Sequence, residues 1–311
     1  MGDYFQQYAE LEVQRRMVSD CWRTDSFASA IREVVATGDV VVDVGTGTGV
    51  LAMLAARAGA RAVYAVDEAE VAQSAADLVS ANGLHETVQV FYGAASQLQV
   101  EEAPDLIMSE WMGNLAFVEG MFDDVLLVRE RLLKPGGRML PAGIEVMLAP
   151  IDDPVLFSAN GPGFWREPIH GLDLSNLEQL ELKQGRAAQM RVEPASLLSP
   201  AAPIVTLDLS LAAPGEQWTN GEVEFEVQRD GVLNGFAGWF VAQLSRSVVL
   251  DTGPHRPVTH WAQTYLAFPP QMTKKGSRLD IAYRLMRHPD NPRNLELTIR
   301  VGRCEQRYIV E

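Results

Sequence analysis

The first half of the chain alternates short apolar runs with stretches of helical periodicity. The apolar runs predict four strands, at 40–44, 62–67, 88–92 and 105–108. Helical patterns lie at 50–58, 68–82 and about 117–133, and a Lys-Pro-Gly-Gly turn at 134–137 ends the last of them. Strands that alternate with helices in this way predict a parallel sheet with crossover helices.

The pattern changes beyond Pro141, where apolar and polar residues alternate with period two. Runs of this kind lie at 205–209, 221–227, 239–244, 264–268, 279–285 and 295–301. Spaced by turn residues, they predict an antiparallel sandwich or barrel. An insert at about 153–203, with Trp165 and a helix-like stretch at 174–186, does not follow this pattern. We therefore expect two domains, 1–141 and 142–311.

Composition narrows the class of protein. The chain has 311 residues, of which 47% are hydrophobic and 22% charged, as in an ordinary globular protein. A formal net charge of −15 argues against a nucleic-acid surface and suits a positively charged substrate. The two cysteines, Cys21 and Cys304, suggest no disulfide framework. No apolar run approaches about 18 residues, and the start lacks a signal peptide, so we expect a cytoplasmic protein without a membrane span.

A glycine-rich turn closes the first predicted strand and opens a helix. It begins with Asp43 and places glycines at 45, 47 and 49, while Val50 stands where the dinucleotide fingerprint would need glycine. Asp67 ends the second strand, where its carboxylate can accept both hydroxyls of a ribose. The turn resembles the D-x-G-x-G-x-G motif of class I S-adenosylmethionine-dependent methyltransferases. Nicotinamide or flavin binding is the alternative.

Two glutamates, Glu110 and Glu119, flank a loop that follows the fourth predicted strand. Like charges held close together must be neutralised, or one of them takes up a proton. A guanidinium resolves this conflict, because its rigid fork of five N–H donors can bind two carboxylates from adjacent edges. The alternative is a pair of solvated loop acids.

In this setting the segment 109–113 together with Glu119 closely resembles the double-E loop of the protein arginine methyltransferases. Further motifs follow in the family's order: an aromatic stretch at 3–8, then Met17, Asp20 and Arg23-Thr24, and late in the chain Thr259-His260-Trp261 at the family's THW loop. The insert around Trp165 has the position and length of the dimerisation arm. The resemblance implies a Rossmann-like sheet followed by an antiparallel β-barrel with a helical arm, assembled as a homodimer.

The resemblance also implies a role for each matching residue. Glu110 and Glu119 would hold and polarise the substrate guanidinium, and His260 would pair with Asp20 beneath the loop. The implied cofactor-binding residues are Phe5, Tyr8, Met17, Arg23, Asp43, Gly45, Gly47, Gly49, Asp67 and Ser96. The implied substrate-binding residues are Glu110, Met112, Asn114, Glu119, Met121, His260 and Trp261. No residue is implied to bind a metal.

Several of these residues have plainer alternatives, and three depart from the family pattern. Met17 and Met121 could be core residues, Arg23 a surface ion pair, and Phe5 and Tyr8 a staple that holds a helix to the core. The departures are Asp67, where the family usually has glutamate, Ser96, where many members place a glutamate near the adenine, and Asn114, which replaces an aromatic residue at the pocket rim.

We therefore expect an S-adenosylmethionine-dependent arginine N-methyltransferase. The substrate is less determined. Arginine outnumbers lysine 22 to 4, the composition is typical of GC-rich bacteria, and the family core begins near residue 3. With Asn114 at the rim, these features favour free L-arginine. Protein or peptide arginine is the alternative. More remote alternatives are a non-catalytic, cofactor-binding dimeric scaffold and methylation of a non-guanidine amine.

Overall fold

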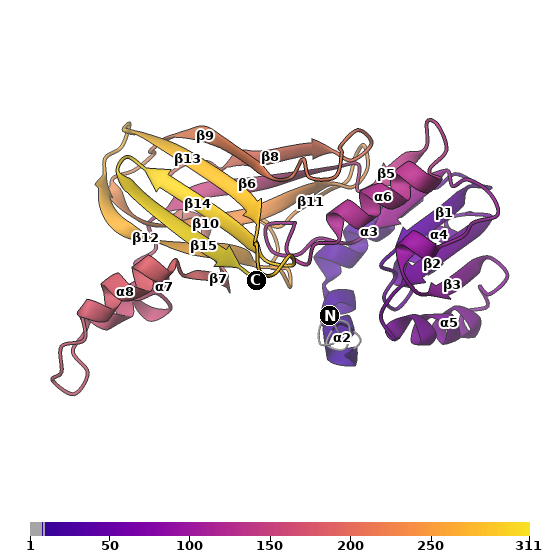
Figure 1. The fold of residues 1–311 in the computed structure, drawn as a ribbon, viewed down its shortest axis with the longest axis horizontal. Coiled ribbons are helices and arrows are strands. Elements are labelled where there is room, and N and C mark those ends of the chain that lie inside the picture. The colour runs from indigo at the N-terminus through magenta and orange to yellow at the C-terminus, as the bar shows by residue number, and fades with distance from the viewer. Residues whose placement is uncertain (1–7, 9) are drawn as a thin grey trace.

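A computed structural model describes residue 8 and residues 10–311, in two parts that lie side by side (Figure 1). The first part holds a five-stranded parallel sheet with the strand order β3-β2-β1-β4-β5. Its strands are β1 (Val40–Val44), β2 (Ala62–Asp67), β3 (Val88–Tyr92), β4 (Leu106–Ser109) and β5 (Arg138–Leu140). The parallel sheet is confirmed. Strands β1, β2 and β3 have the predicted bounds, and β4 begins and ends one residue later than predicted.

Helices α4 (Val50–Arg57) and α5 (Val71–Ala81) follow β1 and β2, close to their predicted positions. The helix predicted from about residue 117 begins only at Phe122, as α6 (Phe122–Leu132), so the prediction was wrong for its first turn. Leu115, Ala116 and Glu119 have φ angles of 48, 66 and 84°, in the left-handed region that a right-handed helix cannot use.

From residue 10 onward, helices α2 (Leu11–Ser19) and α3 (Cys21–Val34) precede the sheet. Asp20 separates them and accepts a hydrogen bond from the backbone N–H of Arg23 at 3.1 Å, which caps α3. The same carboxylate also reaches the second part of the chain, as described below. The junction of the two helices therefore lies close to the interface between the two parts.

The second part, called the barrel below, is built from two antiparallel sheets (Figure 1). One has the order β7-β12-β10-β6-β8 with β11 paired to β10, and the other the order β15-β14-β13-β9. The strands are β6 (Gly143–Ile151), β7 (Ala187–Met190), β8 (Ala202–Asp208), β9 (Thr219–Glu226), β10 (Gly231–Gln243), β11 (Val249–Asp251), β12 (Gln263–Thr273), β13 (Arg278–Arg287), β14 (Leu295–Val301) and β15 (Cys304–Val310). Buried aromatic and aliphatic side chains such as Phe236 and Phe268, with rings 5.3 Å apart, fill the space between the sheets.

The insert between β6 and β7 projects from the barrel, at the lower left of Figure 1. It contains α7 (Pro154–Ala159), a short 3-10 helix (Pro162–Arg166) and α8 (Asn176–Gln184). Trp165 Nε1 donates to Glu181 at 2.6 Å, and Arg166 binds both oxygens of Glu178, at 2.7 and 2.6 Å. These contacts hold the 3-10 helix against α8. The insert exposes four large apolar side chains to solvent, those of Val155, Phe164, Leu172 and Leu180.

Across residue 8 and residues 10–311, no helix is both long and apolar enough to cross a lipid bilayer.

Candidate active site

The glycine turn lies at the carboxyl edge of the parallel sheet, where β1, β2 and β4 end. Gly45 has φ +72°, and a Cβ atom built there would lie 2.8 Å from Cε of Met121. Gly47 has φ +55°, and its N–H donates to Asp67 at 2.8 Å. Both positions favour glycine for conformational reasons, and the turn then leads directly into the N-terminus of α4.

Asp67 ends β2 with its carboxylate almost fully buried. Oδ2 accepts the N–H of Gly47, and Oδ1 accepts the N–H of Ala69, both at 2.8 Å. Burial raises the pKa of this carboxyl above its ordinary value, although both hydrogen bonds act in the opposite direction. Each oxygen keeps a further lone pair, so Asp67 can still accept from two hydroxyl groups.

Asp43 is buried at the centre of the same edge. Its Oδ2 accepts from the hydroxyl of Thr46 at 2.6 Å, whereas the buried Oδ1 has no hydrogen-bond partner among the described residues. Burial raises the pKa of Asp43 to about 7, against the effect of the Thr46 hydrogen bond. A buried acceptor without a partner is costly, so this atom marks a place where a polar ligand group can bind.

The raised pKa of Asp43 predicts a pH-dependent stability of the cofactor-free protein. Between about pH 4 and pH 7 the native state holds a proton that the unfolded chain has released, so stability falls as the pH rises through this window. The slope from one such group is at most roughly 1.4 kcal/mol per pH unit. Urea unfolding at several pH values should show wild type losing stability relative to Asp43→Asn between about pH 4 and pH 7. Parallel curves would contradict this assignment.

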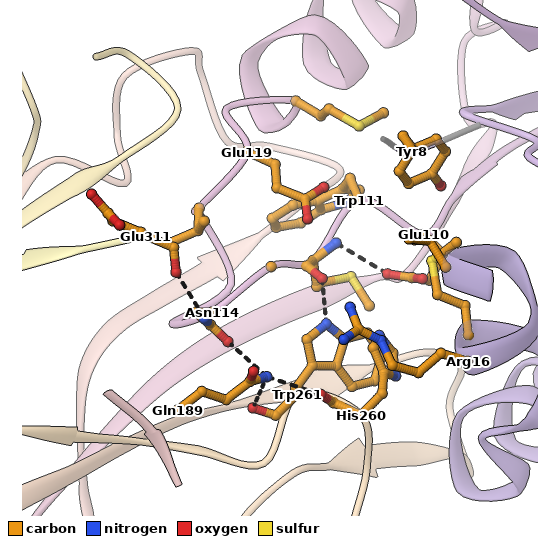
Figure 2. A pocket seen from close by; sticks show the side chains of 16 residues that line it. Tyr8, Arg16, Glu110, Trp111, Asn114, Glu119, Gln189, His260, Trp261 and Glu311 are labelled. Atoms are coloured by element: carbon orange, nitrogen blue, oxygen red, sulfur yellow. Dashed lines mark hydrogen bonds between the residues drawn. The ribbon is translucent and has the colours of Figure 1, made fainter. Parts of the chain in front are cut away.

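Two cavities meet at this edge. The larger, of about 1040 Å³, is lined by the glycine turn at Gly45, by Asp67 and by Ser96. The smaller, of about 170 Å³, is lined by both glutamates of the loop. Tyr8, Glu119 and Met121 line both cavities, so the two spaces are neighbours across these side chains. Figure 2 shows the smaller one, with Glu110 and Glu119 on its wall.

Glu110 follows β4 and is held by a buried ion pair. Its Oε2 lies 2.7 Å from Nε and 2.6 Å from Nη2 of Arg23, and the two side chains are only 6% and 7% exposed. Its Oε1 accepts the N–H of Met112 at 3.1 Å. Arg23 therefore forms a buried ion pair, and the alternative that it forms a surface ion pair is wrong. A contact between Arg23 and a cofactor carboxylate stays a prediction.

Glu119 is positioned by the barrel. Its backbone N–H donates to the carbonyl of Arg293 at 2.8 Å, and the Arg293 guanidinium reaches the carbonyl of Glu119 at 3.4 Å. These contacts support the left-handed conformation of Glu119, which costs a non-glycine residue roughly 1 kcal/mol. Arg293 lies in the loop between β13 and β14. No motif in the sequence signalled its role.

His260 lies beneath the loop and contacts Asp20 twice. Its Nδ1 lies 2.8 Å from Oδ2 of Asp20, and its backbone N–H donates to the same oxygen at 2.9 Å. Burial acts to raise the pKa of Asp20, but the hydrogen bonds from His260 and Arg23 outweigh it and leave the pKa below its ordinary value. The neighbouring Trp261 donates from Nε1 to the carbonyl of Met112 at 2.6 Å. The barrel thus fixes the floor of the pocket.

A network of amide side chains, which the sequence did not reveal, closes the rim. Gln189, in β7 next to the insert, donates from Nε2 to the carbonyls of His260 and Trp261 at 2.8 and 2.7 Å. The same nitrogen lies 3.4 Å from Oδ1 of Asn114, whose own Nδ2 donates to the carbonyl of Glu311 at 2.9 Å. Asn114 therefore connects the glutamate loop to the barrel (Figure 2).

The structure brings most of the predicted site residues together. The residues predicted to bind substrate all line the smaller cavity, as do Tyr8 and Met17, while Gly45, Asp67 and Ser96 line the larger one. Asp20 and Arg23 lie behind these walls and contact residues that form them. Asp43, Gly47 and Gly49 are not among the residues that line either cavity. Phe5 lies outside the described residues.

Comparison with known proteins identifies the family. A family model described as the arginine methyltransferase oligomerization subdomain matches residues 145–303, and one described as ribosomal protein L11 methyltransferase (PrmA) matches residues 24–146. Protein arginine N-methyltransferase 6 of Xenopus tropicalis is 33% identical over 274 residues, which span 85% of this chain and 80% of the relative. The chain belongs to the protein arginine methyltransferase family.

Further relatives agree with this result. The probable protein arginine N-methyltransferase 6 of Arabidopsis thaliana is 30% identical and matches 99% of this chain and 80% of its own length. A chain of the PRMT1 enzyme–prozyme heterotetramer of Trypanosoma brucei, solved with AdoHcy, superposes with a TM-score of 0.90 at 28% identity, covering 98% of this chain and all of that one. Protein arginine methyltransferase 10 of Arabidopsis thaliana superposes with a TM-score of 0.85 at 28% identity, covering 99% of this chain and all of its own.

These relatives confirm the family, the two-part fold and the enzyme class that the sequence predicted. As a member of this family, the chain is an arginine N-methyltransferase that uses S-adenosylmethionine.

Proposed function

We propose that this enzyme methylates a guanidino nitrogen of arginine residues in proteins or peptides. The observation that carries the proposal is that Glu110 and Glu119 line one small cavity, whose wall is shared with the large cavity beside the glycine turn. The relatives reported above, all named as protein arginine methyltransferases, support a protein substrate, which the sequence left as the alternative. They do not support free L-arginine, which the sequence features favoured.

The residues at the sheet edge fit S-adenosylmethionine. Asp67 keeps lone pairs for two ribose hydroxyls, the unpartnered Oδ1 of Asp43 can accept from a polar group, and Gly45 leaves room where a Cβ would collide. We propose that these residues, together with Ser96 on the wall of the same cavity, hold the cofactor. When bound there, the cofactor supplies an electrophilic methyl group on a sulfonium.

The chain's own residues would prepare the nucleophile. A guanidinium is a poor nucleophile, because its positive charge and its lone pairs are delocalised. Glu110 and Glu119 would draw the positive charge toward the nitrogens they bind and leave the third nitrogen freer to attack. Their second task is alignment, since correct positioning alone can supply roughly 7–11 kcal/mol of the barrier. The hydrogen bond from Glu119 N–H to Arg293 supports this positioning.

A proton must leave the guanidinium during methyl transfer. Two groups of this chain are placed to accept it, the carboxylate of Glu119 and the imidazole of His260. His260 is oriented by Asp20, whose carboxylate stays ionised because hydrogen bonds hold its pKa below the ordinary value. Either group could act as the general base in this arrangement.

The substrate can be tested directly. Labelled S-adenosylmethionine is incubated with the full-length protein and either L-arginine or an arginine-rich peptide, and the products are analysed by mass spectrometry. We expect label on a peptide arginine and little methylarginine from the free amino acid. Methylation of L-arginine alone would overturn the proposal in favour of the original preference.

We further propose that the enzyme is a homodimer assembled through the insert that contains α7 and α8. The family model that matches residues 145–303 describes an oligomerization subdomain, and the insert exposes four large apolar side chains. Leu180, in α8, is 52% exposed. Burying one leucine is worth about 1.5–3 kcal/mol. Leu180→Asp should therefore weaken self-association roughly 10–100-fold.

Light scattering across a concentration series is the measurement for this prediction. Leu211→Asp is the matched control, because Leu211 is 80% exposed but lies outside the insert. The control should self-associate like wild type. A wild-type protein that is monomeric at micromolar concentration would argue against the dimer itself.

A further inference from the structure

Arg16 places a guanidinium in the wall of the smaller cavity, which is the pocket proposed to receive the guanidinium of the substrate. Val13, Arg16 and Met17 have the i, i+3, i+4 spacing of one helix face, and all three line the smaller cavity. Figure 2 shows Arg16 reaching from α2 into this pocket. The adjacent Arg15 is exposed on another face of the helix and does not line the cavity.

Two carboxylates of the same wall, those of Glu110 and Glu311, have partners other than Arg16. Glu110 is bound by Arg23 and by the N–H of Met112, and the Glu311 side chain accepts from Asn294 at 3.2 Å. Arg16, in contrast, makes neither a side-chain hydrogen bond nor an ion pair with any residue that the structure describes. Its guanidinium is therefore available to a ligand.

A plainer role is that Arg16 only complements the negative end of the α2 dipole. This role needs only a solvated side chain in the last turn of the helix. It does not account for the placement of a positive charge in a pocket for a positive substrate, where like charges repel. The repulsion would be offset if the substrate itself carried a negative group close to its arginine.

We propose that Arg16 determines specificity by binding a carboxylate of the substrate at the mouth of the pocket. A planar guanidinium binds a carboxylate through two parallel N–H···O hydrogen bonds. The inference rests on the proposed function, in which the carboxylate belongs to an aspartate or glutamate near the target arginine in a peptide. The α-carboxylate of free arginine offers the same chemistry. We assign this carboxylate to the substrate and not to the cofactor, because Arg16 lines the smaller cavity and does not line the larger one.

The test uses three peptides that differ only in one residue next to the arginine, which is Glu, Gln or Lys. L-Arginine and L-argininamide form a second pair that differs only in the α-carboxylate. Wild type should have its lowest KM for the Glu peptide. Arg16→Ala should raise that KM roughly 3–10-fold, as expected for a charged hydrogen bond that solvent weakens at an exposed site, while kcat and the KM for the Gln peptide stay within about twofold.

Two further variants make the test specific. Arg16→Glu should reverse the preference, so that the Lys peptide has the lowest KM. Arg15→Ala removes the same charge from the same helix outside the pocket and should behave like wild type. The Kd for S-adenosylhomocysteine, measured by calorimetry, should be equal in all variants. A weaker Kd in Arg16→Ala would overturn the assignment, because Arg16 would then serve the cofactor.

The outcomes separate this inference from the proposed function. If the peptides are methylated with equal KM values, or if Arg16→Ala leaves the Glu-peptide KM unchanged, the role of Arg16 is overturned and the proposed function stands. If no peptide is methylated but L-arginine is, with argininamide a poorer substrate and an Arg16-dependent KM, the carboxylate site stands and the proposed protein substrate fails. If L-arginine is methylated, no peptide is, and the KM for L-arginine does not depend on Arg16, both fail.

Discussion

Glu119→Gln is expected to lower kcat by roughly 10²–10³-fold while leaving the Kd for S-adenosylhomocysteine within about threefold of wild type. The substitution keeps the size of the side chain and removes the charge that would polarise the substrate guanidinium, and losses of this size are typical when one preorganised electrostatic group is removed. The backbone contact between Glu119 and Arg293 is unaffected, so the loop should keep its conformation. Single-turnover methylation of a peptide, together with calorimetry, measures both quantities.

Glu110→Gln should show a similar loss of methyl transfer with cofactor binding retained. The loss of activity in this variant is harder to interpret, because Glu110 also neutralises the buried guanidinium of Arg23. We therefore expect Glu110→Gln, but not Glu119→Gln, to lower the melting temperature as well. Glu305→Gln, at an exposed position of β15 remote from both cavities, is the control and should match wild type. Full activity in both loop variants would remove the basis for the proposed clamp.

Asp67→Asn is expected to weaken cofactor binding roughly 10–100-fold. Both oxygens of Asp67 accept backbone N–H groups, and an asparagine must turn its NH₂ group toward one of these donors. The variant loses a charged hydrogen-bond acceptor, worth about 1.5–3 kcal/mol, at the place proposed for the ribose. Titration with S-adenosylhomocysteine gives the Kd, and kcat at saturating cofactor should be largely restored.

A restored kcat at saturating cofactor would show that Asp67 acts in cofactor binding and not in the methyl transfer itself. If kcat stays low at saturating cofactor, Asp67 has a further role in the transfer itself. If the Kd does not change, the larger cavity is not the cofactor site. Asp290→Asn, in the exposed loop after β13, is a suitable control for the loss of one negative charge.

Much of the fold could be predicted because the relevant signals are local. The valine-rich runs of β1, β2 and β3 have the bounds that the apolar pattern predicted, since a buried parallel strand is apolar on both faces. The start of α6 was wrong for a non-local reason. Residues 115–118 are apolar, as the buried face of a helix would be. Contacts with the barrel, however, hold Glu119 in a left-handed conformation, which prevents a right-handed helix from including it.

The candidate site divides in the same way. Glu110, Glu119, Asp67 and the glycine turn could be found from the sequence, because their chemistry depends on residue type and short spacing. Gln189, Arg293 and Arg16 could not. Gln189 and Arg293 act through backbone atoms of residues 71 and 174 positions away, and no spacing rule connects such pairs. Arg16 differs from its neighbour Arg15 only in the direction it faces.

The sequence by itself thus determined the family and the two-part architecture, and it supplied the residues that are proposed to perform the chemistry, because all of these follow from local patterns and motifs. The tertiary structure decided which of those residues meet. It pairs Arg23 with Glu110, supports the backbone of Glu119 from the barrel, and turns one of two adjacent arginines into the pocket. The physical reason is that a contact between distant segments depends on the packing of whole sheets and helices, which no short stretch of sequence specifies alone.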